Sequence, residues 1–223
     1  MIHLKITWKY CLAFYCIIML YASLHELVHH FSGYIICGDW GYKTFNYFET
    51  SCEGSPQSWY ATYMGPVFSF VMMYIGAYFI NKGLSTFKKH LGFAMIFAQL
   101  PLQRMISPFF RMNDEFYATA QLFGNTTLNY WIVIVIIWII CIPPLITAYK
   151  AIKNNRKLPW FLFYLVLFPY ILWGPVFGLL EFLMVQKGIM SHTFIGIGLL
   201  FIINELVTIA AYFIFKKYIN PER

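Results

Sequence analysis

Charged residues are scarce in this chain of 223 residues. They make up 11% of the sequence, whereas about 25% is usual in a soluble domain, whose surface must face water. Acidic residues are rarest, with 9 Asp and Glu against 16 Lys and Arg. Internal repeats and low-complexity segments are also lacking. This composition argues against a sizeable soluble domain and favours a protein whose outer surface faces lipid.

Long apolar segments take the place of the missing charge. Six of them are long enough to cross about 30 Å of hydrocarbon at about 1.5 Å per residue. They are residues 8–32, 59–80, 91–108, 129–149, 160–186 and 192–215. Because the connections are short, the sequence predicts an all-α fold: one integral membrane domain over residues 1–223, built as a bundle of about six transmembrane helices.

Basic residues divide unevenly between the two sides of this bundle. Six spans place both termini on one side, which receives 12 of the 16 Lys and Arg: Lys5, Lys9, Lys82, Lys88, Lys89, Lys150, Lys153, Arg156, Lys157, Lys216, Lys217 and Arg223. The other side receives Lys43, Arg104, Arg111 and Lys187. Because short cytoplasmic loops carry an excess of Lys and Arg, we expect a multi-pass protein with both termini cytoplasmic. The net charge of +7 then implies contact with lipid headgroups, not with nucleic acid.

Two of the five cysteines bracket the first external loop. Cys37 and Cys52 can form a disulfide that closes this loop, or they can remain free thiols. The distance between them is not fixed by the sequence, so both alternatives stay open.

The first span contains a zinc-hydrolase motif: His25 and Glu26, followed by Leu27, Val28 and His29. Residues four apart lie on one face of a helix, so the two histidines can bind one metal ion. Glu26 can then reach a water molecule on that metal. Zinc lowers the pKa of such a water, and a carboxylate accepts its proton as the water attacks a carbonyl. The motif predicts zinc as the cofactor, His25 and His29 as ligands and Glu26 as the general base.

Two other interpretations compete for these histidines. Polar groups inside a membrane helix are costly and are usually functional, but these can also form hydrogen bonds near the external interface. With His30, the motif is similar to a histidine box of membrane di-iron enzymes, yet the sequence contains no second box. His30 points about 100° away from His29 on a helix. We expect His30 to support the site or the interface rather than to bind the metal.

A catalytic zinc site usually has three protein ligands, so a third must come from another element. Asp114 and Glu115 follow the third span on the external side, at the level of the histidines. Asp114 is the expected ligand and Glu115 an alternative. With Asn113, these two acids can instead form the capped first turn of a helix.

Two residues elsewhere remain candidates for the site. Glu181, in the outer part of the fifth span, is the second choice for the third ligand. Arg104, toward the outer end of the third span, can stabilise an oxyanion, hold Asp114 or extend to the interface.

The arrangement resembles the site-2-protease-like intramembrane zinc metalloproteases, in a small-protein branch of that family. The matching segments are the motif of the first span, Met64-Gly65-Pro66 in the second, and Arg111 to Glu115 with Leu122-Phe123-Gly124 after the third. They span about the first 125 residues. The resemblance implies that His25, His29 and Asp114 are zinc ligands and that Glu26 is the general base. The family's Asn-x-x-Pro stretch leading to Leu-Asp-Gly is absent, and Asn113-Asp114-Glu115 stands in its place.

The sequence therefore predicts a membrane-embedded zinc metalloendopeptidase that hydrolyses peptide bonds of membrane-associated proteins or peptides. The alternative is a non-catalytic metal-binding membrane protein, such as a transporter or an assembly factor. A third possibility is a family member that binds substrates without cutting them. A transporter would favour several metal sites along a path, and only one cluster is found. Glu26 separates the classes, because a hydrolase requires it and a structural metal site does not.

Overall fold

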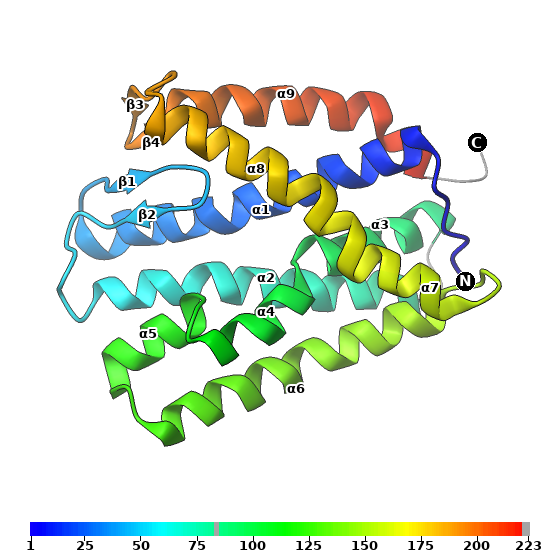
Figure 1. Ribbon diagram of the computed structural model, residues 1–223, viewed down its shortest axis with the longest axis horizontal. Helices are drawn as coiled ribbons and strands as arrows, with labels where there is room; N and C mark the ends of the chain where they lie inside the picture. The colour runs from blue at the N-terminus through cyan, green and yellow to red at the C-terminus, as the bar shows by residue number, and fades with distance from the viewer. Residues whose placement is uncertain (83–84, 220–223) are drawn as a thin grey trace.

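Helices dominate the computed structural model of the chain, which describes residues 1–82 and 85–219, apart from the side chains of Leu172 and Trp173. Figure 1 shows long helices lying side by side, with a small sheet at one end. The helices are α1 (Trp8–Cys37), α2 (Ser58–Asn81), α3 (Thr86–Ala98), α4 (Pro101–Ile106), α5 (Asp114–Phe123), α6 (Thr127–Ala151), α7 (Lys157–Leu162), α8 (Gly174–Glu181) and α9 (Leu199–Phe215). Shorter 3-10 or π-helical segments are η1 (Ser107–Phe110), η2 (Phe163–Leu167), η3 (Pro169–Trp173), η4 (Phe182–Gln186) and η5 (Lys216–Ile219). The strands are β1 (Tyr42–Lys43), β2 (Phe48–Glu49), β3 (Thr193–Phe194) and β4 (Ile197–Gly198).

Five helical segments of the described chain are long and apolar enough to cross a membrane, by length and composition. They are Trp8–Cys37, Ser58–Asn81, Thr127–Ala151, Lys157–Gln186 and Leu199–Ile219. Each overlaps one of the six segments expected from the sequence. The predicted helical architecture is confirmed for these five.

The sixth expected segment, residues 91–108, is not one continuous helix. It divides into α3 and α4 at Leu100, whose φ of 51° is left-handed. Pro101 follows in the first turn of α4. A proline has no N–H to donate and restricts the residue before it, so the helix stops there. In Figure 1, α3, α4 and α5 follow one another from the end that holds the termini toward the opposite end. The prediction of a single helix was wrong.

A four-stranded sheet, in the order β2-β1-β4-β3, lies at the end opposite the termini (Figure 1). β1 and β2 form an antiparallel hairpin, in which Lys43 pairs with Phe48. β4 joins β1 in parallel through Ile197 and Lys43. The last span was expected to begin at residue 192, but β3 and β4 occupy that segment and α9 begins at Leu199. Apolarity alone does not separate a short strand from the start of a helix.

The loop that carries the hairpin is closed by a disulfide between Cys37 and Cys52. Their Cα atoms lie 5.5 Å apart across a sequence separation of 15 residues. Of the two alternatives that the sequence left open, the structure contains the bonded one. Gly38 caps α1 with a φ of 81°, a left-handed conformation that turns the chain toward the hairpin. Both ends of the hairpin loop are therefore fixed to the end of α1.

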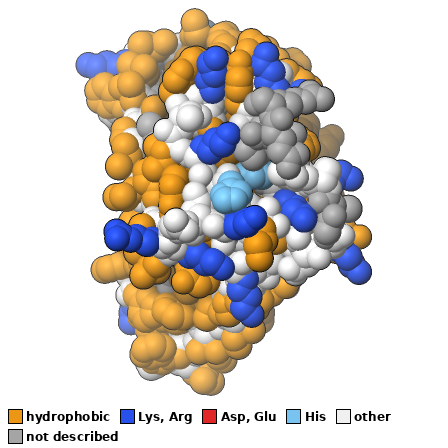
Figure 2. Space-filling view, turned by 90° about the vertical axis from the view of Figure 1, so that its right-hand side faces the viewer, with side chains coloured by type: hydrophobic (Ala, Val, Ile, Leu, Met, Phe, Trp, Pro, Cys, Tyr) orange, Lys and Arg blue, Asp and Glu red, His pale blue; other side chains and the backbone are white. Residues whose placement is uncertain are grey.

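Basic side chains gather at the end that holds both termini. Figure 2 looks onto this end and shows many Lys and Arg side chains but no Asp or Glu among the described residues. Ile2 forms a β-bridge with Ile152, which attaches the N-terminal segment to the connection between α6 and α7. Arg223, which was also expected at this end, lies outside the described residues.

The buried side chains of α1 change in character along the helix. In its first half they are mostly apolar and belong to the main core. In its second half they are Ser23, His25, His29, His30 and Gly33. Buried polar groups need hydrogen-bond partners or a ligand. The second half of α1 is therefore where a functional site is expected.

Candidate metal centre

Three side chains from two helices converge at this part of α1. His25 and His29 lie one turn apart on one face of α1, and Asp114 begins α5. The Nε2 atoms of the two histidines are 3.0 Å apart. Asp114 Oδ2 lies 3.1 Å from the first and 3.4 Å from the second. Among the described residues, this is the group of His, Cys, Asp or Glu that is close enough to hold one metal ion.

The spacing of these three atoms matches the edges of a zinc coordination tetrahedron. Bonds of about 2.0–2.1 Å at tetrahedral angles place neighbouring ligand atoms about 3.3–3.4 Å apart. The separations here are 3.0, 3.1 and 3.4 Å. Two imidazoles and one carboxylate are also a ligand set of catalytic zinc, with the fourth position left for water or substrate. The cluster, which we call the His–His–Asp cluster, fits a zinc ion.

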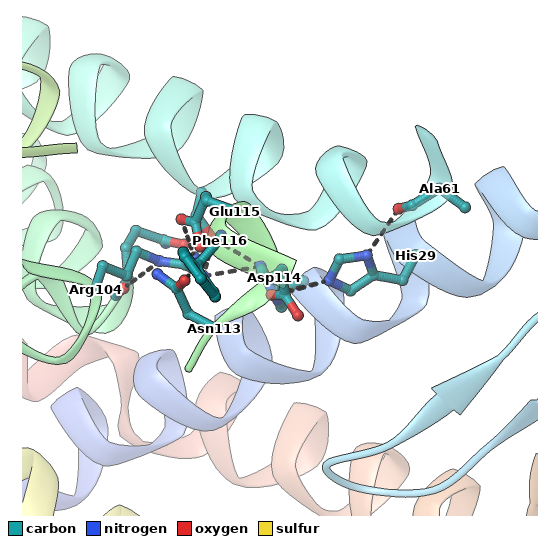
Figure 3. A network of polar contacts seen from close by, with 10 residues as sticks. His29, Ala61, Arg104, Asn113, Asp114, Glu115 and Phe116 are labelled. Carbon is teal, nitrogen blue, oxygen red and sulfur yellow. Dashed lines mark hydrogen bonds and ion pairs between the residues drawn. The ribbon is translucent and has the colours of Figure 1, made fainter. Parts of the chain in front are cut away.

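His29 is fixed by α2 and by the hairpin. Its Nδ1 donates a hydrogen bond of 2.8 Å to the carbonyl oxygen of Ala61, as Figure 3 shows. A carbonyl oxygen only accepts, so Nδ1 carries the proton and Nε2 presents its lone pair to the cluster. Phe48 of β2 stacks on the imidazole with ring centroids 4.3 Å apart. Both the tautomer and the orientation of His29 are therefore set by its neighbours.

His25 is held by a hydroxyl on α2. Its Nδ1 lies 3.0 Å from Ser69 Oγ and 3.0 Å from Arg104 Nη2. Arg104 Nη2 in turn donates to Ser69 Oγ over 3.0 Å. A guanidinium only donates, so Arg104 can donate to Nδ1 only when Nδ1 carries no proton, whereas the Ser69 hydroxyl can accept a proton from Nδ1. Nε2 of His25 is left for a metal ion, as it is in His29, in the tautomer in which Nδ1 donates to Ser69.

Arg104 connects this arrangement to α5. Its Nη1 donates to Glu115 Oε1 over 3.0 Å, and its Nε donates to the carbonyl oxygen of Gln99 over 3.1 Å. Glu115 is buried, so its ion pair is shielded from water. Two of the three roles left open for Arg104 are not seen: its guanidinium stays inside the protein, and it holds Glu115 and Ser69 rather than Asp114. Arg104 also lines the cavity beside the cluster, so the third role, stabilisation of an oxyanion, stays a prediction. Glu115 is the partner of Arg104, not a member of the cluster.

Asp114 lies in the first turn of α5, as the helix-cap interpretation of the sequence required. Asn113 is the cap, and its Oδ1 accepts a hydrogen bond of 3.1 Å from the backbone N–H of Phe116. Burial works to raise the pKa of Asp114, but hydrogen bonds to His25 and His29 outweigh it and hold that pKa well below its usual range. The cap and the cluster are compatible, because the cap orients the helix turn that presents Asp114 as a carboxylate.

Glu26 faces a cavity beside the cluster. The cavity has a volume of about 230 Å³, and His25, Glu26 and Asp114 are among the residues that line it. A second cavity, of about 420 Å³, is lined in part by Asp114 and Trp59. Asp114 thus borders both cavities. Glu26 is partly exposed and forms no hydrogen bond with another described residue. Its carboxylate is therefore available to a molecule in the smaller cavity.

Glu181, the second choice for the third ligand, binds the hairpin instead. Its Oε1 accepts a hydrogen bond of 2.8 Å from Thr44 Oγ1, and its Oε2 accepts one of 2.9 Å from the backbone N–H of Phe45. Glu181 is therefore not a member of the His–His–Asp cluster. The depth of Glu181 in the bundle was compatible with a ligand role, but its carboxylate satisfies the hairpin turn.

His30 lies outside the cluster, as its direction on the helix indicated. Its Nε2 donates a hydrogen bond of 2.8 Å to the carbonyl oxygen of Ile195, beside β4. Its ring stacks on Trp40 with centroids 5.1 Å apart. His30 therefore attaches the C-terminal part of α1 to the sheet.

Sequence reasoning missed several residues that surround the cluster, namely Lys43, Phe48, Ala61 and Ser69. Lys43 was counted as an external loop residue, yet its side chain is fully buried. Its ammonium lies 3.6 Å from the ring centroid of Phe201 and donates to the carbonyl oxygen of Thr44 over 2.7 Å. Burial lowers the pKa of Lys43 to about 8, against the attraction of nearby carboxylates, chiefly Glu26. No local signal in the sequence distinguishes a buried loop lysine from a solvated one.

Gly65 of α2 leaves room for both histidine rings. A Cβ atom at this position would lie 2.6 Å from Cε1 of His29 and 2.7 Å from Cε1 of His25. We expect Gly65→Ala to displace the rings and to lower zinc affinity by about 10–100-fold, the usual effect of disturbing the groups that orient metal ligands. Competition with a chelating dye measures the affinity. Gly178→Ala is the control, because nothing lies within 4 Å of its Cβ position. Wild-type zinc affinity in a folded Gly65→Ala protein would contradict the close approach of the two histidine rings to Gly65.

Comparison of the chain with protein-family models, with curated proteins and with solved structures found no match. The assignment of a function therefore depends on the geometry of the cluster and on the motif that contains it.

Proposed function

We propose that this protein is a membrane-embedded zinc metalloendopeptidase, with the activity of the site-2-protease-like family that its motif resembles. One observation carries the proposal. The ligand atoms of His25, His29 and Asp114 are spaced as zinc requires, and Glu26 faces the cavity beside them. A site that only stored or transported metal would have no need for this carboxylate.

The protein's residues would divide the work of peptide hydrolysis among them. Bound zinc would lower the pKa of a water molecule and polarise the carbonyl of the substrate. Glu26 accepts the proton of the attacking water and returns it to the leaving amine. The carbonyl of Ala61 keeps His29 in the tautomer that exposes Nε2, and Ser69 accepts the Nδ1 proton of His25 in the zinc-bound form. Arg104, held by Glu115, keeps Ser69 in place.

The proposed setting is a bilayer, with the helices crossing it and both termini in the cytoplasm. Five long apolar helices and the basic end in Figure 2 support this setting. The substrate would be a membrane-associated protein or peptide. In a helix each peptide group is covered and hydrogen-bonded, so the substrate must be locally unwound at the bond to be cut.

Metal analysis together with a cleavage assay tests the proposed function. The purified protein, in detergent micelles, should contain about one zinc ion per chain. It should cut fluorescein-labelled casein, a largely unfolded protein, and a chelator should stop the reaction until zinc is added back. Zinc without any zinc-dependent cleavage would favour the alternative, a non-catalytic metal-binding membrane protein.

The proposed orientation makes a separate prediction. A cysteine introduced at Lys153, in the connection after α6, should resist an impermeant thiol reagent applied to intact cells, because short cytoplasmic loops retain Lys and Arg. A cysteine at Ser191, which is exposed near β3, should react. The unmodified protein provides the background of the native cysteines. Labelling of the cysteine at position 153 from outside the cell would show that the orientation is the opposite of the proposed one.

A further inference from the structure

Two side-chain amides border the smaller cavity without a hydrogen-bond partner among the described residues. Asn46 belongs to the turn between β1 and β2, and Gln103 to α4. Both are exposed, and neither forms a hydrogen bond with another described residue. They line the same cavity as Glu26. The cavity is thus bordered by Glu26, by His25 and Asp114 of the His–His–Asp cluster, and by two available amides.

The turn that carries Asn46 is anchored on both sides of this residue. Glu181 of α8 accepts hydrogen bonds from Thr44 and Phe45, which directly precede Asn46. The Phe45 ring is fully buried and lies 5.2 Å from the ring of Phe201, between centroids. After the turn, the β-hairpin resumes at β2. Asn46 is therefore the exposed tip of a buried and hydrogen-bonded turn, presented to the cavity.

Gln103 is placed by its neighbour in α4. Arg104 is held through its Nε by the carbonyl oxygen of Gln99 and through its Nη1 by Glu115. These contacts fix the first turn of α4 against α3 and α5. Gln103, one residue earlier, then borders the cavity from the side of α4, whereas Asn46 borders it from the hairpin.

The chemistry of these two amides defines the ligand that they suit. A carboxamide offers two donors and one acceptor, and so can pair with both the N–H and the C=O of a peptide group. A helical peptide has already used these groups internally, whereas an extended one has not. We propose that Asn46 and Gln103 bind the backbone of an extended substrate segment beside the His–His–Asp cluster, and that Glu181 is the positioning residue for Asn46. This inference rests on the proposed peptidase function.

Cleavage kinetics with fluorescein-labelled casein test the proposal. A net hydrogen bond contributes enough to change binding about 3–10-fold, so Asn46→Ala and Gln103→Ala should each raise KM by about that factor. Zinc content should stay at the wild-type level, because neither amide contacts the cluster. Gln121→Ala is the matched control, since Gln121 is an exposed amide of α5 that borders neither cavity. A wild-type KM in both Asn46→Ala and Gln103→Ala would overturn the proposal.

The positioning role of Glu181 is tested by combining variants. Glu181→Ala should raise KM like Asn46→Ala, and the double variant should be no worse than either alone, because both changes remove the same contact. A general loss of structure would instead lower kcat and zinc content together. Glu181→Gln keeps an acceptor for one of the two hydrogen bonds, so its KM should lie between those of the wild type and Glu181→Ala. If the increases in KM caused by Glu181→Ala and Asn46→Ala add in the double variant, Glu181 does not act through Asn46.

A binding measurement keeps this proposal separate from the peptidase function. Fluorescence anisotropy of the labelled casein on the zinc-loaded Glu26→Gln protein needs no cleavage. Asn46→Ala in that background should weaken binding about 3–10-fold. A labelled alanine-rich helical peptide should bind more weakly and should not respond to Asn46→Ala. If the wild type cuts nothing but these differences are found, the peptidase function fails and the peptide-binding site stands. Equal casein binding by the Glu26→Gln protein with and without Asn46→Ala would show that Asn46 does not bind the peptide backbone.

Discussion

Replacement of Glu26 by Gln should reduce casein cleavage by about 10²–10⁴-fold, the usual contribution of general acid–base catalysis, while zinc content stays near that of the wild type. The amide keeps the size of the side chain and can still form hydrogen bonds, but it cannot accept a proton from water. Glu26 is next to His25 in sequence, yet it is not part of the His–His–Asp cluster. The loss should therefore lie in kcat and not in metal binding.

Zinc content and cleavage must be measured on the same preparation of Glu26→Gln. Glu49→Gln is the matched control: Glu49 is a partly buried glutamate of β2 that borders the larger cavity, which Glu26 does not line. It should keep its zinc and lose no more than a small part of its activity. Unchanged cleavage by Glu26→Gln would exclude the proposed hydrolytic mechanism. The protein would then be better described as a metal-binding membrane protein.

Replacement of His29 by Ala should empty the metal site, whereas His30→Ala should leave it filled. His29 supplies one of three ligand atoms and is fully buried, so no nearby group can replace it. Two remaining ligands do not hold a catalytic zinc ion, and bound zinc should fall from about one per chain to near zero. His30 donates to the carbonyl oxygen of Ile195 and takes no part in the cluster.

His29→Ala and His30→Ala form a matched pair, because both histidines are buried and adjacent on the same helix. Elemental analysis after dialysis measures zinc, and thermal unfolding of the apo proteins shows whether His30→Ala has simply destabilised α1. Asp114→Asn should fall between the two variants in zinc affinity, because the amide oxygen can still coordinate but its charge is lost. Complete loss of zinc in a stably folded His30→Ala protein would place the metal on a different face of α1.

Features that depend on neighbours in sequence were predicted from the sequence. The spacing of His25 and His29 on one face follows from helix geometry, and the structure has it. The helix cap at Asn113 was an alternative that the sequence offered, and the structure contains it. The concentration of basic residues at one end followed from the order of apolar segments alone. In each case the helix period or the chain direction determines the outcome, and no contact between distant elements is needed.

The break at Leu100 shows where this reasoning ends. Apolarity extends across residues 91–108, so hydropathy predicted one span there. Pro101 was visible in the sequence, but a proline inside an apolar segment either kinks a helix or ends it, depending on what packs around it. Here the chain ends α3, and Arg104 of the next helix reaches Gln99, Glu115 and Ser69.

Which carboxylate meets the histidines was decided by tertiary structure. Asp114, Glu115 and Glu181 all had a suitable depth in the predicted bundle, and depth was the criterion that the sequence offered. The direction of each side chain depends on how its helix is rotated against its neighbours. That rotation places Asp114 at the histidines, Glu115 at Arg104 and Glu181 at the hairpin. The sequence alone determined the five long apolar helices, the motif and the distribution of charge, because these are local or additive properties. Packing between residues far apart in the chain decided the third member of the cluster, because only that packing fixes how the helices are turned.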